Sequence, residues 1–157
     1  MVNITQAAER VAKAYAMACL LGANTSVPTK QAAATIAKFY LPNAIQFSLG
    51  RITQFPNETS LAAVVEEEIE EKAAMGYGSN FTIEHLRVEP VSIESAAVWI
   101  TWHNHPLRGC YADSVALDLY GFRLNPNASN GFGGGWDYVI PDNAALGFKK
   151  VVAEADC

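Results

Sequence analysis

The chain has 157 residues, of which 50% are hydrophobic and 17% charged, and its formal net charge is -5 at pH 7. This length and composition are typical of one globular domain with a single core, so we expect one domain over residues 1–157. The acidic balance and the lack of a basic patch argue against a nucleic-acid partner, and no apolar run is long enough to cross a membrane.

The apolar residues of the first half of the chain have the period of helices. We expect helices at Thr5–Leu21, at Thr29–Tyr40, where Pro42 follows as a stop, and at Glu58–Ala74. The side chains of the third helix expected to face the core are Leu61, Val64, Val65 and Ile69. Those expected in solvent are Glu66, Glu67, Glu70 and Glu71.

Strand patterns dominate the second half. Phe81–Glu89 and Ala96–His105 predict an antiparallel hairpin, which would set His85 opposite Thr101. The apolar side switches within the first of these strands, so we expect a bulge near Glu84 or His85. The other strands are expected at Ala44–Leu49, Asp113–Leu124, Trp136–Ile140 and Phe148–Val152.

The cysteines bear on the compartment. Cys19, Cys110 and Cys157 are odd in number and lack metal-type spacing, so we expect no disulfide framework and a reducing, cytoplasmic environment. Five Asn-x-Ser/Thr sequons point instead to secretion, which stays open as the alternative. They begin at Asn3, Asn24, Asn57, Asn80 and Asn127.

The strand Ala96–His105 carries the densest set of side chains able to do chemistry. Its period of two places Trp99, Thr101, His103 and His105 on one face. Two imidazoles at this spacing can act as general acid and base, or chelate a metal if a third ligand lies nearby. The candidates for that ligand are His85, Asp113 and Asp118. Because the sequence does not fix any of them beside the histidines, we expect no metal.

Asp118 is unusual because it interrupts an apolar strand. Leu117 and Leu119 flank it, and Tyr120 and Phe122 follow on its own face. A carboxyl walled by aromatic rings has a raised pKa and suits proton transfer, whereas on an exposed sheet face it would be ordinary. Both placements remain open at this point.

The order of elements resembles the SnoaL-like branch of the nuclear transport factor two-like (NTF2-like) superfamily. The most specific passage is Lys38–Leu49, KFYLPNAIQFSL, which is similar to the segment that leads these folds from the second helix into the first strand, although Asn43 stands where Asp is commoner. The resemblance implies an α+β fold, with a cone-shaped, curved, antiparallel-dominated sheet wrapped around three N-terminal helices. It also implies an apolar pocket, frequent homodimers, and either cofactor-free cyclases, dehydratases and isomerases or proteins that only bind.

We therefore expect a cofactor-independent enzyme that cyclises, isomerises or dehydrates a polyketide- or terpenoid-like molecule by proton transfer. His103 would be the base or acid, Asp118 its carboxylate counterpart, and His85 or Tyr138 a hydrogen-bond donor. The residues expected to contact the substrate are Trp99, Thr101, Tyr120, Phe122, Trp136 and His105. The alternative is a non-catalytic module of the same fold that binds a small ligand or another protein. The expected partners are a small apolar molecule and a second copy of the chain.

Overall fold

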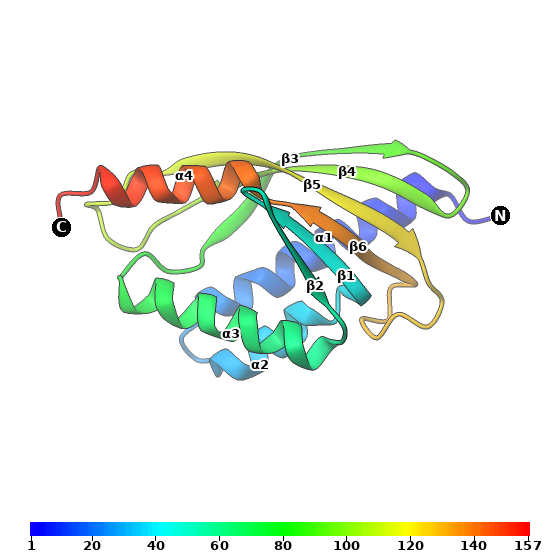
Figure 1. The fold of residues 1–157 in the computed structure, drawn as a ribbon, viewed down its shortest axis with the longest axis horizontal. Coiled ribbons are helices and arrows are strands. Elements are labelled where there is room, and N and C mark those ends of the chain that lie inside the picture. The colour runs from blue at the N-terminus through cyan, green and yellow to red at the C-terminus, as the bar shows by residue number, and fades with distance from the viewer.

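The computed structural model describes residues 1–157 and combines helices with one six-stranded sheet (Figure 1). The helices are α1 (Ile4–Leu20), α2 (Thr29–Ala37), α3 (Glu58–Ala74) and α4 (Asp142–Ala153), with a short 3-10 turn at Leu21–Ala23. The strands are β1 (Tyr40–Ser48), β2 (Arg51–Phe55), β3 (Phe81–Pro90), β4 (Ser95–Asn104), β5 (Ser114–Leu124) and β6 (Gly134–Ile140). None of the helices combines the length and apolarity needed to cross a membrane.

The sheet has the strand order β2-β1-β6-β5-β4-β3. Every neighbouring pair is antiparallel except β1 and β6, which run parallel. Figure 1 shows the strands curving over α1, with α2 and α3 side by side beyond it and α4 near the C-terminus. The α+β class and the curved, antiparallel-dominated sheet predicted from the sequence are confirmed, with α4 as an additional helix.

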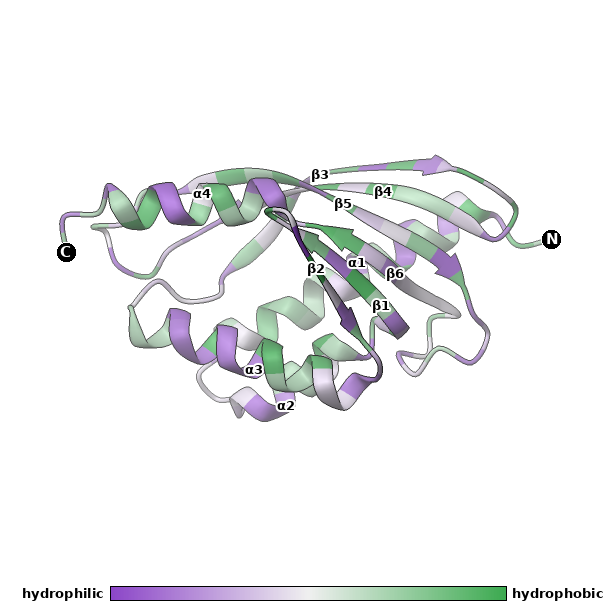
Figure 2. Ribbon diagram, viewed as in Figure 1, coloured by the Kyte–Doolittle hydropathy of each residue, from purple (hydrophilic) through white to green (hydrophobic).

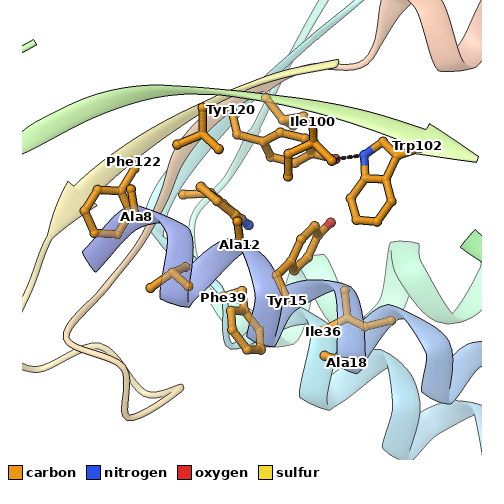
Figure 3. Packing of buried hydrophobic residues seen from close by; sticks show 14 of the residues in the cluster. Ala8, Ala12, Tyr15, Ala18, Ile36, Phe39, Ile100, Trp102, Tyr120 and Phe122 are labelled. Carbon is orange, nitrogen blue, oxygen red and sulfur yellow. Dashed lines mark hydrogen bonds between the residues drawn. The ribbon is translucent and has the colours of Figure 1, made fainter. Parts of the chain in front are cut away.

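The core lies between α1 and the concave face of the sheet. On β4 the even-numbered side chains Val98, Ile100 and Trp102 are buried, and the odd-numbered ones point to the convex face. On α1 the small side chains of Ala8 and Ala12 are fully buried and let the helix approach the strands closely (Figure 3). This alternation decides which strand residues can reach the interior.

Several predicted details hold. The hairpin pairs His85 with Thr101, and its register shifts between Ile83 and His85, where the bulge was expected. In α3, Leu61 and Ile69 are buried and Val65 is half-buried on the inner side, whereas Val64 is 38% exposed. Figure 2 shows hydrophilic and hydrophobic residues alternating along α3, and Glu67, Glu70 and Glu71 are exposed as expected, while Glu66 is half-buried.

Other expectations were wrong. Phe148–Val152 forms part of α4, because Phe148 and Val151 lie three residues apart on one helix face and pack on Tyr77 and Tyr111. The short, polar edge strand β2 was not expected, although Leu49 and Gly50 form the tight turn with positive φ that joins it to β1.

The second helix is shorter than the predicted Thr29–Tyr40. Backbone helix ends at Ala37, and β1 begins at Tyr40, before Pro42. Pro42 is therefore a residue of β1 rather than the residue that stops α2.

The expectation that the chain has no disulfide was wrong. Cys110 and Cys157 form a disulfide with their Cα atoms 5.5 Å apart, across 47 residues of sequence. The sequence did not reveal this pair because α4 is the element that returns the C-terminus to the loop between β4 and β5. Cys19 is the free cysteine.

Candidate active site in the cone

A cavity of about 430 Å³ lies between the concave face of the sheet and helices α1, α3 and α4. Most of its lining side chains are apolar. The polar or ionisable ones are Tyr15, Cys19, Tyr40, Gln46, Ser48, Glu68, Glu71, Lys72, Tyr77, Ser79, Asn104, Asp118 and Tyr120. Lining residues that are also exposed to solvent, Val64, Glu68 and Glu71, lie on α3, so the cavity opens along this helix.

Asp118 is the buried carboxyl of this cavity. It lies on β5 opposite Ile100 of β4 and is 3% exposed. Its Oδ1 accepts a hydrogen bond from the backbone N–H of Ala144, 3.3 Å away in the first turn of α4. Burial raises the pKa of Asp118 to about 7, and the nearby charge of Asp142 acts in the same direction, whereas the Ala144 hydrogen bond opposes it. Both protonation states of this carboxyl are therefore populated near neutral pH.

Four tyrosines line the cavity with Asp118, and three of them make side-chain hydrogen bonds there. Tyr15 of α1 and Tyr40 of β1 are joined by a hydrogen bond of 2.8 Å between their hydroxyls. The indole N–H of Trp102 donates to the Tyr120 hydroxyl, 3.1 Å away (Figure 3). Because Tyr120 accepts that bond, its own hydrogen is free, and so is one hydrogen of the Tyr15–Tyr40 pair.

These phenols are neutral at physiological pH. Burial raises the pKa of Tyr15, Tyr40 and Tyr120 above the ordinary tyrosine value, and the charge of Asp118 contributes to the rise at Tyr40 and Tyr120. Contacts between aromatic rings also hold these tyrosines in place, since the centre of the Tyr15 ring lies 5.7 Å from that of Tyr120 and 6.0 Å from that of Trp102. The cavity thus holds a carboxyl beside preorganised hydrogen-bond donors.

The opening carries charge. Glu68 and Lys72 are one turn apart on α3, and the Lys72 Nζ lies 4.8 Å from the centre of the Phe81 ring and 5.4 Å from that of Phe148. Burial among these groups lowers the pKa of Lys72 and raises that of Glu68, while each charge counteracts the effect on the other. Glu68 remains accessible from solvent because it borders the opening.

The structure brings only some of the residues predicted for the site to this cavity. Asp118 and Tyr120 line it. Phe122 and Trp136 are buried in the adjoining core, where the Trp136 ring lies 5.0 Å from that of Tyr120, and they support the wall without lining it.

The remaining predicted residues lie on the convex face. Trp99, Thr101, His103 and His105 have odd numbers on or directly after β4 and point away from the cavity. His85, opposite Thr101, is exposed. Tyr138 packs over Gly121, also on the outer side, and does not line the cavity. The expected proton-transfer pair of His103 and Asp118 is therefore wrong, because the β4–β5 register pairs even residues with even ones and leaves His103 on the opposite face from Asp118.

The outer histidines form a separate cluster. His103 and His105 lie with their ring centres 4.0 Å apart, beside the carboxylate of Asp113. Asp113 was one of the third ligands considered from the sequence, and the structure places it next to both imidazoles. The reason for expecting no metal, the lack of a fixed third ligand, no longer applies.

The tyrosines of α1 and β1 and the charged pair of α3 were not predicted from the sequence as residues of the site. Tyr15 had a usable signal, since it is the one aromatic residue within the alanine-rich buried stripe of α1. Glu68 and Lys72 had no sequence signal that marked them as site residues, because a charged residue on an amphipathic helix ordinarily faces solvent.

Solved structures with similar folds include an NTF2-like protein from Novosphingobium aromaticivorans, with a TM-score of 0.63 and 12% identity over 93% of this chain and 87% of that one. A proposed SnoaL-like polyketide cyclase from Shewanella putrefaciens has a TM-score of 0.52 and 15% identity over 98% and 87%. A proposed scytalone dehydratase from Novosphingobium aromaticivorans has a TM-score of 0.56 and 8% identity over 87% and 80%.

These likenesses show that the chain has the NTF2-like fold, as the sequence resemblance implied. No protein-family model and no curated protein sequence matches the chain. The fold and its cavity define an α+β cone with an internal cavity that contains a buried carboxyl.

Proposed function

We propose that the protein is a cofactor-independent enzyme that moves protons on a small, largely apolar, oxygenated molecule held in the cone. The observation that carries the proposal is Asp118, a carboxyl 3% exposed in an apolar cavity, with a pKa of about 7. A general base works best when its pKa lies near the working pH, because it is then both ionised and able to hold the proton it takes.

The hydroxyls of the cavity supply the second part of the chemistry. When Asp118 removes a proton from a carbon next to a carbonyl, negative charge develops on the carbonyl oxygen. The free hydrogens of Tyr120 and of the Tyr15–Tyr40 pair can be donated to that oxygen. The protonated Asp118 then returns its proton to another carbon, which isomerises the molecule, or to a departing hydroxyl, which dehydrates it.

The size and lining of the cavity support a small organic substrate. A volume of about 430 Å³ is within the range of roughly 300–1,000 Å³ typical of ligand sites. Apolar and aromatic walls that also carry hydroxyl groups and a carboxyl suit an oxygenated polyketide- or terpenoid-like compound. The proposed cyclase and dehydratase among the similar structures support the reaction class without identifying the substrate.

A non-catalytic ligand-binding module is the second candidate. The hydrogen bond from Ala144 to Asp118 favours it, because a carboxylate at a helix N-terminus also has a purely structural use. The two functions differ in what happens to a bound ketone. An enzyme exchanges the hydrogens next to its carbonyl, and a binding protein leaves them in place.

The test is hydrogen exchange of α-tetralone and smaller cyclic ketones in D₂O, followed by NMR. We expect the wild-type protein to accelerate exchange, with a rate that rises with pH through about 7 as Asp118 ionises. Asp118→Asn should lower the rate by about 100-fold or more. Saturable ketone binding without exchange, unchanged in Asp118→Asn, would support the binding module instead.

A further inference from the structure

A cluster on the convex face of the sheet lies outside the proposed active site. The histidines His103 and His105 stand at the end of β4 and the carboxylate of Asp113 at the start of β5. Asn104 pairs with Ser114, so the same antiparallel register continues to place Asp113 opposite His105 and diagonal to His103. All three side chains point to the outer side, away from the cavity.

The ligand atoms of this cluster are already gathered. The Nε2 of His103 lies 3.1 Å from Oδ2 of Asp113, and the Nδ1 of His105 lies 3.8 Å from the same oxygen. One ligand atom from each residue falls within 4.8 Å of the others. In a tetrahedral site with metal–nitrogen bonds of about 2.0–2.1 Å, neighbouring ligand atoms are about 3.3 Å apart. The cluster therefore approximates one face of such a site.

A second residue orients one of the imidazoles. The Nε2 of His105 is hydrogen-bonded to the Thr82 hydroxyl, 2.9 Å away, on the neighbouring strand β3. When Nε2 carries the hydrogen and donates to Thr82, the lone pair of Nδ1 faces Asp113 and is available to a metal. Metal-binding histidines commonly hold their other nitrogen in this way.

From this geometry we infer a binding site for a divalent transition metal ion, with His103 Nε2, His105 Nδ1 and Asp113 Oδ2 as its ligands. Two imidazoles and one carboxylate suit Zn²⁺. The side chains are 30%, 35% and 62% exposed, so water can occupy the fourth position. The ion would join the end of β4 to the start of β5 and fasten the base of the loop that carries Cys110.

Zn²⁺ itself is the probe. The oxidised, tag-free protein is stripped with EDTA, dialysed and titrated with ZnCl₂ by calorimetry, and the bound metal is measured after gel filtration. We expect one Zn²⁺ per chain and a higher melting temperature. His103→Ala and Asp113→Asn should abolish this binding, and Thr82→Val should weaken it by roughly 10–100-fold.

His85→Ala is the matched control, because His85 is the third histidine of the chain and is exposed on the neighbouring strand, outside the cluster. It should bind Zn²⁺ like the wild type. Circular dichroism checks that each variant is folded. The inference is overturned if the wild type takes up less than a stoichiometric amount, or if uptake survives in folded His103→Ala and Asp113→Asn.

Discussion

Asp118 on β5 accepts a hydrogen bond of 3.3 Å from the backbone N–H of Ala144, and this contact ties the central strand to the first turn of α4. The same carboxyl is buried, which raises its pKa to about 7 from the ordinary value of 3.8 for an aspartic acid side chain. Asp118 therefore has a structural role, the hydrogen bond from Ala144, and an acid–base property, its raised pKa. A substitution by Asn can keep the first and remove the second.

The first prediction concerns stability and pH at this residue. Between pH 3.8 and about 7 the folded protein keeps the proton of Asp118 while the unfolded chain releases it. The free energy of unfolding therefore falls as pH rises through this window, by up to about 4 kcal/mol from this group. In Asp118→Asn the amide oxygen can still accept from Ala144, but no charge is buried. We expect the variant to be more stable than the wild type at pH 8 and less active.

Urea unfolding at pH 4, 6 and 8 provides the measurement. The difference between variant and wild type should grow with pH, and Asp156→Asn, at an exposed C-terminal position, should show no such trend. A variant that is equally destabilised at every pH would mean that Asp118 serves mainly as a cap of α4.

The second prediction concerns the tyrosine hydroxyls. Tyr120→Phe removes the donor proposed for the substrate oxygen and leaves the Trp102 N–H without its partner. We expect turnover in the ketone exchange assay to fall by about 10- to 100-fold, and stability by about 1–3 kcal/mol. Tyr138→Phe is the control, since Tyr138 lies on the outer side of the sheet over Gly121. Equal losses of turnover in both variants would argue against a role for the Tyr120 hydroxyl.

The sequence was sufficient for α1 to α3 and for strands β1 and β3 to β6, because the periods of helices and strands repeat over many residues, but it did not predict α4 or the edge strand β2. It even located the β3 bulge, since the apolar side switches there. It did not show which face of β4 is concave, because Trp99 and Trp102 make both faces look apolar. Which face of β4 is concave depends on where α1 packs. Because α1 covers the even-numbered side chains, His103 lies on the outer surface and not in the expected active site.

Contacts between residues far apart in the chain also could not be predicted from the sequence. Tyr15 and Tyr40 lie 25 residues apart and meet only because α1 packs on the concave face of the sheet, and Cys110 meets Cys157 only because α4 folds back. Asp118 was different, since a carboxyl within an apolar strand is already a local anomaly that suggests burial or a partner.

A third prediction follows from the disulfide. Linking Cys110 to Cys157 restricts the unfolded chain, so its removal should cost about 2–4 kcal/mol of stability. The paired variant Cys110→Ser with Cys157→Ser should reproduce the effect of a reductant and become insensitive to it. Thiol titration of the denatured, unreduced protein should find one free thiol, that of Cys19. Three free thiols in protein purified without reductant would contradict the disulfide.

The last prediction is that the chain forms a homodimer through the middle of the convex face, around Leu117 and Trp99, with the cluster of His103, His105 and Asp113 at the end of β4 outside the interface. Leu117 is 40% exposed on β5, and Trp99 of β4 faces the same side, so this surface would leave apolar area in water. Light scattering should give about twice the chain mass of 16.9 kDa at micromolar concentration. Leu117→Glu should shift the protein to monomers because it would bury a charge at the interface, whereas Leu146→Glu, an exposed site on α4, should not. A monomeric wild type, or a dimer unaffected by Leu117→Glu, would place the apolar face of β5 outside any interface between copies.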